Sequence, residues 1–114
     1  MAIYIKTDKA QELLELMKGA CEPDTPPGPR RDWLVDQEGD FRLGSEREAA
    51  WFRPFVTGDF LVFGIIGRKD SDMSNCTYAQ YHSSLIDFVL AHYDGMFSDV
   101  RATAKKDESY DRFH

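Results

Sequence analysis

The spacing of hydrophobic and polar residues changes along the chain, and each change predicts an element of secondary structure. Residues 2–6, with the sequence AIYIK, are mostly β-branched or aromatic, which predicts a strand. Residues 9–20 carry apolar side chains at intervals of three and four residues, which is the period of a helix. Thr7 and Asp8 are candidate N-caps for this helix, and Pro23 follows its end.

The middle of the chain predicts a hairpin, a short helix and two further strands. Residues 32–44, DWLVDQEGDFRLG, contain two short apolar runs around a turn at residues 37–39. Ser45 and Glu48 form the S-x-x-E pattern of a capping box, which predicts a short helix that ends before Pro54. A short strand is expected over residues 52–56. The most apolar run, residues 60–66, does not alternate, which is typical of a strand covered on both faces.

The last third of the chain predicts one long helix and a final strand. Thr77 and Gln80 form a second capping box, which predicts a helix over residues 78–94 that is closed by Gly95. Residues 98–104, SDVRATA, then predict a strand with Val100 and Ala102 on one face. Residues 105–114 are expected to form a charged tail.

These elements together predict an α+β fold. We expect one domain over residues 1–104, with a mainly antiparallel sheet of four to five strands, one long C-terminal helix packed on a face and two shorter helices. The length of 114 residues suits a single domain. Residues 22–32 hold four of the five prolines and predict a Pro-rich loop.

The net charge of the chain favours some classes of binding partner over others. Twenty acidic and fourteen basic residues give a net charge of −6, which disfavours nucleic acid and anionic membranes and favours a basic protein. Cys21 and Cys76 are far apart and lie in no metal-ligand pattern, so we expect no metal, cofactor or disulfide. The N-terminal residues lack the pattern of a secretory signal, and no apolar run is long enough to span a membrane. We therefore expect a cytoplasmic protein.

The long predicted helix carries two histidines and allows two interpretations. His82 and His92 fall on its packing face or at the margin of that face, where histidines usually fill the core. They are ten residues apart, about 15 Å along a helix, which is too far to share one metal ion. The alternative is a pocket for a small molecule or a reaction, lined by Cys76, Tyr81, His82 and His92.

Acidic residues and tryptophans in the middle of the chain predict a protein-binding surface. The spacing of the acidic residues in the predicted hairpin does not fit a calcium loop, because glycine and glutamate are not at the positions that an EF-hand needs. Charge accelerates encounter, and aromatic anchors hold a complex together. The predicted partner-binding residues are Trp33, Asp36, Glu38, Asp40 and Trp51. The alternative is a solvated acidic face with both tryptophans in the core.

The layout of the second half of the chain resembles a known class of inhibitors. The order GDFLVFGIIG, a polar loop, TYAQYHSSLIDFVLAHYDGMF and SDVRATA covers about 45 residues. It is similar to the small acidic immunity proteins of bacterial toxin systems in size, charge and layout, and it also looks like phage-encoded inhibitors such as anti-CRISPR proteins. The resemblance implies a non-catalytic inhibitor, without enzymatic activity, that occludes a basic toxin or nuclease domain. It carries over no site residue.

Two other classes remain open from the sequence. One is a small-molecule-binding protein or small enzyme with its pocket near His82. The other is a homo-oligomeric structural or phage component.

Overall fold

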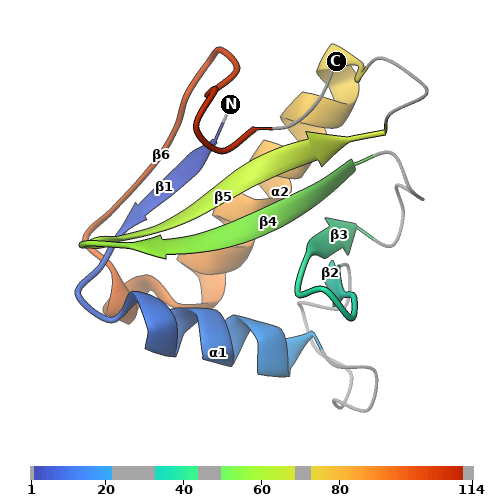
Figure 1. Ribbon diagram of the computed structural model, residues 1–114. Helices are drawn as coiled ribbons and strands as arrows, with labels where there is room; N and C mark the ends of the chain where they lie inside the picture. The colour runs from blue at the N-terminus through green and yellow to red at the C-terminus, as the bar shows by residue number, and fades with distance from the viewer. Residues whose placement is uncertain (1, 22–32, 44–49, 69–72, 112–114) are drawn as a thin grey trace.

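The computed structural model describes residues 2–21, 33–43, 50–68 and 73–111. They form a six-stranded antiparallel sheet with the strand order β2-β3-β4-β5-β1-β6, together with two α-helices (Figure 1). The elements in chain order are β1 (Ile3–Lys6), α1 (Ala10–Ala20), β2 (Trp33–Val35), β3 (Phe41–Leu43), β4 (Ala50–Thr57), β5 (Phe60–Gly67), α2 (Asn75–His92), the 3₁₀ helix η1 (Asp94–Met96) and β6 (Asp99–Ala102). Among the described residues, no helix is both long enough and apolar enough to cross a membrane.

The α+β class and the antiparallel sheet are confirmed, whereas the counts of strands and helices differ from the prediction. The sheet has six strands rather than four to five, and the described part of the second shorter helix, residues 50–53, is a strand. That helix was predicted from the capping box at Ser45 and Glu48, which lie outside the described residues. Residues 50–53 belong instead to β4, which pairs along its whole length with β5, from Ala50 opposite Gly67 to Thr57 opposite Phe60.

Pro54 fits inside β4 because β5 is the only described strand that pairs with β4 at this position. Proline has no N–H to donate, so it is tolerated in a strand only where no neighbouring strand needs that group. β4 pairs with β3 at a single position, Phe52 opposite Phe41, and Pro54 lies beyond it. Pro54, which was expected to mark the end of a helix, is thus part of a strand.

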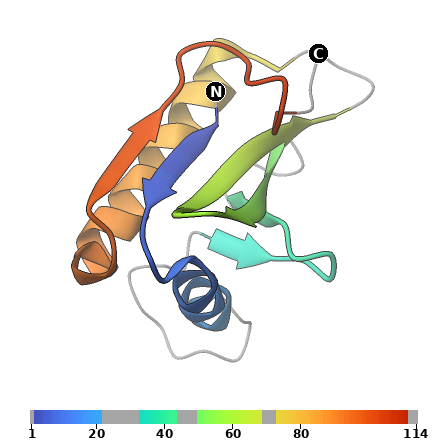
Figure 2. The same cartoon turned by 60° about the vertical axis from the view of Figure 1, so that its left-hand side comes forward.

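Both helices pack on the same face of the sheet, where the core lies. Figures 1 and 2 show α2 running behind the sheet and α1 lying across one end of it. The strand side chains on this face alternate with those on the other face, and they join the buried residues of both helices in one cluster. Its fully buried members include Ile3, Ile5, Leu13, Met17, Phe41, Phe52, Leu61, Phe63, Ile65, Tyr81 and Leu85.

The predicted helix boundaries shift slightly at α2. Its N-cap is Ser74, whose hydroxyl accepts a hydrogen bond from the Thr77 amide at 3.1 Å, so the Thr77–Gln80 box does not begin the helix. The helix ends at His92, and Gly95 lies in η1. At α1, the hydroxyl of Thr7 accepts a hydrogen bond from the Lys9 amide at 3.0 Å, just before the helix begins.

The other face of the sheet is partly covered by the chain that follows β6, which we call the C-terminal strap (residues 103–111). Figures 1 and 2 show this red segment passing from β6 over the N-terminal end of β1 to β5. Asp111 is only 1% exposed, and its carboxylate accepts hydrogen bonds from the amides of Ile65 at 2.8 Å and Asp107 at 2.7 Å. The hydroxyl of Tyr4 donates a hydrogen bond to Asp107. Asp107 and Asp111, which belong to the segment expected to form a charged tail, therefore hold this segment against the sheet.

Aromatic contacts and a close approach to a glycine also hold the C-terminal strap against the sheet. The ring of Tyr110 lies 5.0 Å from that of Phe55 and 5.9 Å from that of Tyr4, measured between centroids. Its backbone passes so close to Gly64 that a Cβ atom there would lie 2.1 Å from the carbonyl oxygen of Tyr110. Gly64 thus allows the strap to touch the main chain of β5, which is the close approach that a glycine within a strand predicts.

The ionisation of two tyrosines tests this packing. Burial raises the pKa of both Tyr4 and Tyr78 from 10.0 to about 12, and the hydrogen bond to Asp107 adds to the effect at Tyr4. The folded chain therefore holds these protons more tightly than the unfolded chain. This contribution to stability is intact below pH 10 and is lost as the pH rises through about 12.

We expect an absorbance titration of the five tyrosines to show that at least two of them ionise about two pH units above the ordinary tyrosine pKa of 10.0. Tyr4→Phe should remove one of the late phenols and leave the other. Ionisation of all five near pH 10 in a chain that is still folded by circular dichroism would contradict this packing.

Candidate functional site

The turn between β2 and β3 is built by its own first acidic residue. One carboxylate oxygen of Asp36, Oδ1, accepts hydrogen bonds from the amides of Glu38 at 2.9 Å and Asp40 at 3.0 Å. Gly39 takes a positive φ of 85°, which closes the turn at residues 37–39 as predicted. The role of Asp36 is therefore to hold the turn in shape while its side chain stays exposed.

Asp40 is buried and paired with a cation. The residue is 4% exposed, and its carboxylate accepts hydrogen bonds from Arg53 Nε to Oδ1 at 3.0 Å and from Arg53 Nη2 to Oδ2 at 2.8 Å. This two-pronged hydrogen bond raises the pKa of Arg53, and the nearby charge of Glu38 adds to the effect. Asp40 therefore links the turn to β4. Because its charge is balanced by that of Arg53, it is a weak attractant for a cation of a partner.

Glu38 is the acidic residue that extends into solvent. Its side chain is 77% exposed, and Oε2 lies 3.8 Å from Nη2 of Arg53, a loose ion pair. An exposed ion pair of this length contributes little to stability, so Glu38 can turn toward another cation at small cost. The three predicted acidic residues thus lie together but have different roles.

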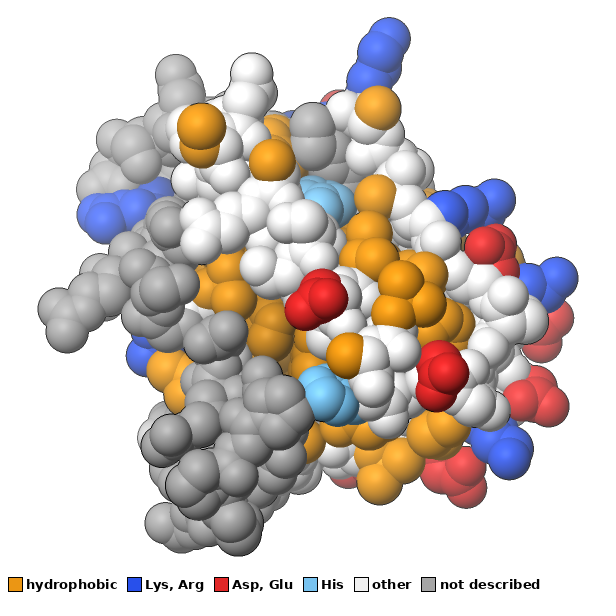
Figure 3. Space-filling view, turned by 180° about the vertical axis from the view of Figure 1, so that it is seen from behind, with side chains coloured by type: hydrophobic (Ala, Val, Ile, Leu, Met, Phe, Trp, Pro, Cys, Tyr) orange, Lys and Arg blue, Asp and Glu red, His pale blue; other side chains and the backbone are white. Residues whose placement is uncertain are grey.

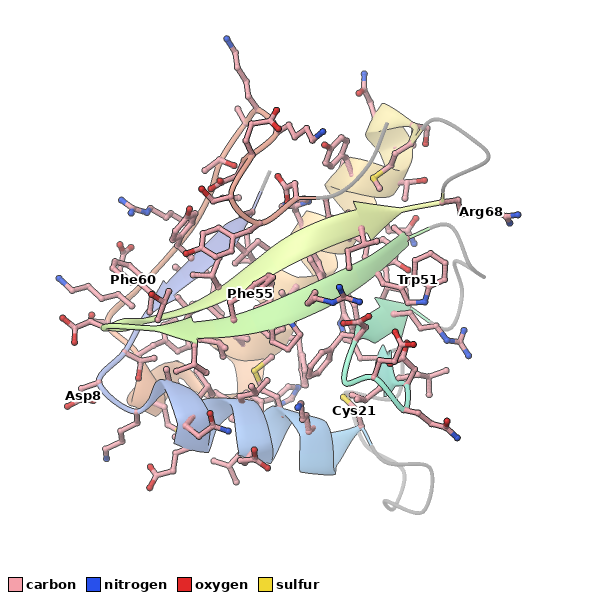
Figure 4. The ribbon with its side chains drawn as sticks, in the orientation of Figure 1. Asp8, Cys21, Trp51, Phe55, Phe60 and Arg68 are labelled. Carbon is pink, nitrogen blue, oxygen red and sulfur yellow. The ribbon has the colours of Figure 1, made fainter. Side chains whose placement is uncertain are left out.

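A groove of about 480 Å³ runs between this turn and the sheet. Half-buried Trp51 and Ile66, which face each other across β4 and β5, supply its apolar part. Figure 4 shows Trp51 at the start of β4 beside the β2–β3 hairpin. The residues that line the groove are Asp36, Gln37, Glu38, Asp40, Trp51, Arg53 and Ile66. An apolar floor with a mainly acidic rim is suited to a cation on an apolar stem.

Trp33 is the exception among the predicted partner-binding residues. It is 2% exposed and packs on the helix side, with its ring 5.6 Å from Tyr81 and 6.0 Å from Phe52. Trp33 is paired with Leu43 in the register of β2 and β3 and shares the core face with it. The expectation that Trp33 contacts a partner is therefore corrected: it is a core residue.

Of the residues that line the groove, the sequence analysis did not predict Gln37, in the turn itself, and two residues of the sheet, Arg53 and Ile66. Both follow from the β4–β5 pairing, because residues two apart on a strand share a face and Arg53 stands two positions after Trp51. The signal was present in the alternation of the letters WFRPF. It was obscured by the capping box, which favoured a helix there.

The four residues of the predicted alternative pocket are not brought together. Tyr81 is fully buried, where its hydroxyl donates to the carbonyl oxygen of Ala50 at 2.7 Å and accepts from the amide of Leu43 at 3.2 Å. Nδ1 of buried His82 lies 2.8 Å from the carbonyl oxygen of Tyr78. Cys76 and His92 are exposed near opposite ends of α2, about 24 Å apart along the helix.

Within the part of the chain that is described, no three His, Cys, Asp or Glu side chains are grouped so that they could hold a metal ion. No protein family, no curated protein and no solved structure matches this chain. A function is therefore argued from the groove and its residues.

Proposed function

We propose that this chain is a non-catalytic inhibitor of the immunity type, which binds a basic partner such as a toxin or nuclease domain. The observation that carries the proposal is the groove, in which the exposed carboxylate of Glu38 stands beside the half-buried ring of Trp51. The net charge of −6 supports a partner of opposite sign. Inhibition would follow from occlusion of the partner's active site.

The chemistry of the groove favours a lysine or arginine side chain of the partner. The aliphatic stem of such a residue would lie on Trp51 and Ile66, and its charge would reach Glu38 and Asp36 at the rim. Asp40 is already paired with Arg53, so Asp36 and Glu38 are the carboxylates left to meet a cation of the partner. Long-range attraction accelerates encounter, and the apolar contact slows dissociation.

The test begins with affinity capture of the partner from native lysate at about 50 mM and about 300 mM salt, followed by kinetic measurement with the purified partner. We expect Glu38→Lys to lower the affinity about tenfold, mainly through the association rate. Trp51→Ala should raise the dissociation rate, with a loss of about 2 kcal/mol in binding free energy.

Glu12→Lys is the matched control, because it makes the same change of charge on the exposed side of α1, away from the groove. It should reproduce only the small effect of the altered net charge. If Glu38→Lys and Trp51→Ala both bind as tightly as the unchanged protein at low salt, the groove is not the binding surface. A partner that is not basic would overturn the proposal as a whole.

A further inference from the structure

The strand β6 forms the edge of the sheet at the end opposite the groove. Within the described chain it pairs only with β1, from Ile3 opposite Ala102 to Lys6 opposite Asp99. The amide of Thr103 donates to the carbonyl oxygen of Ala2 at 3.0 Å in the same register. Because hydrogen bonding alternates along an antiparallel pair, the backbone groups of Val100 and Ala102 point outward, away from β1.

This edge strand is short and carries two charged residues, but it lacks the proline and the bulge that block the pairing of a further strand. It contains neither proline nor glycine, and its residues are in regular pairing with β1. The guanidinium of Arg101 is drawn over the sheet face, where it lies 5.3 Å from the ring centroid of Tyr4 and 5.7 Å from that of Phe60. No described strand pairs with the outward backbone groups of β6, so a further strand can pair with them.

Apolar side chains border the same edge on the helix side. Leu90 is 49% exposed on the last turns of α2, from which the chain passes through η1 into β6. Ile86 of α2, Tyr93 just after α2 and Val100 of β6 are half-buried and pack against the core. Figure 3, seen from behind, shows hydrophobic side chains at the surface on the side of the molecule that carries β6. A strand added here would also cover apolar surface.

The charges on β6 are complementary to those of a second, antiparallel copy of the strand. Outward residues must face outward residues for the new hydrogen bonds to form, which limits the registers. With Val100 on the two-fold axis, Asp99 of each copy stands opposite Arg101 of the other. Centring the pair on Asp99 or on Arg101 would instead place like charges opposite each other, which is unfavourable.

We propose that this protein forms a two-fold symmetric homodimer through β6, with Val100 on the axis and Asp99 opposite Arg101 of the other copy. The two sheets then join into one continuous sheet, and the α2 helices lie on the same side of it. The two grooves lie at its far ends. The inference goes beyond the proposed function and does not depend on it.

The first experiment measures the molar mass of the whole chain by sedimentation over a range of concentrations. We expect twice the mass of 13.1 kDa, falling to the monomer mass on dilution. Val100→Pro should yield a folded monomer, because its N–H points outward and is used only between copies. A chain that stays monomeric at about millimolar concentration, or a dimer that persists in Val100→Pro, would overturn the proposal.

The second experiment tests the register. Asp99→Lys and Arg101→Glu each place like charges opposite each other at both contacts, and each should weaken the dimer about tenfold. An equimolar mixture of the two variants restores opposite charges at both contacts and should restore dimerisation. Because Arg101 also stacks on Tyr4 and Phe60, circular dichroism must show that both variants are folded.

Glu12→Lys on α1 serves as the charge control and should dimerise like the unchanged chain. If the mixture dimerises no better than either variant alone, the register is wrong. If both single variants dimerise like the unchanged chain, then β6 is not the interface, and an interface on another surface replaces the one proposed.

Discussion

Replacing Gly64 with alanine should displace the C-terminal strap and lower the free energy of unfolding by about 3 kcal/mol. The new Cβ atom would lie 2.1 Å from the carbonyl oxygen and 2.5 Å from the carbonyl carbon of Tyr110. Both are backbone atoms, so no side-chain rotation relieves the clash. The chain must give up the hydrogen bond from the Ile65 amide to Asp111 or distort β5.

Hydrogen exchange distinguishes the strap from the rest of the fold in this variant. We expect the amides of Ile65 and Asp107, both of which donate to the Asp111 carboxylate, to exchange much faster in Gly64→Ala. Gly95→Ala is the matched control, since a Cβ atom at Gly95 would meet nothing within 4 Å and its φ is not positive. Unchanged stability together with continued protection of Ile65 would show that the strap is not seated on Gly64.

Tyr81→Phe should cost about 2–3 kcal/mol, although it removes a single oxygen atom. The hydroxyl both donates to Ala50 and accepts from Leu43 in a fully buried position. A phenylalanine ring would keep the contacts with Trp33 and Phe52, so the loss is that of the two hydrogen bonds alone. Urea unfolding should show a lower midpoint with an unchanged slope.

Tyr110→Phe provides the comparison for this measurement. Its ring contacts with Tyr4 and Phe55 would remain, and its hydroxyl makes no hydrogen bond within the described part of the chain. We expect a change below about 0.5 kcal/mol. Equal stability of Tyr81→Phe and the unchanged protein would mean that the link between Leu43 and Ala50 contributes nothing, contrary to the geometry.

Hydrophobic periodicity was sufficient to predict most of the fold. The apolar run at residues 60–66 lies in β5, inside the sheet, and the three- and four-residue spacing at residues 9–20 corresponds to α1. The helix wrongly predicted over residues 50–53 rested on a capping box, which reports only on neighbouring residues. These residues instead pair with β5, and this pairing depends on contacts with another segment of the chain. The position of Pro54 is explained by the fold, in which no described strand pairs with this residue on the side away from β5.

The sequence predicted which acidic residues lie together in the candidate site, but not what each of them does there. Asp36, Glu38, Asp40 and Trp51 do line one groove, as their clustering in the sequence suggested. The pairing of Asp40 with Arg53 depends on the fold, since alternating charge in a hairpin does not reveal which carboxylate is buried. The packing of the C-terminal strap could not be predicted from the sequence for the same reason. It depends on the hydrogen bond from the Ile65 amide to Asp111, and these residues are 46 positions apart in the chain.

The buried hydroxyl of Tyr81 also determines where the chain can be lengthened. It joins Leu43 and Ala50, the described residues on either side of residues 44–49, so the two ends of that connection are held together by α2. Closing a longer connection between fixed ends costs only about 0.6 kcal/mol for each doubling of its length. A foreign peptide or a reporter domain inserted between residues 44 and 49 should therefore leave the sheet assembled, which makes this connection a suitable grafting position.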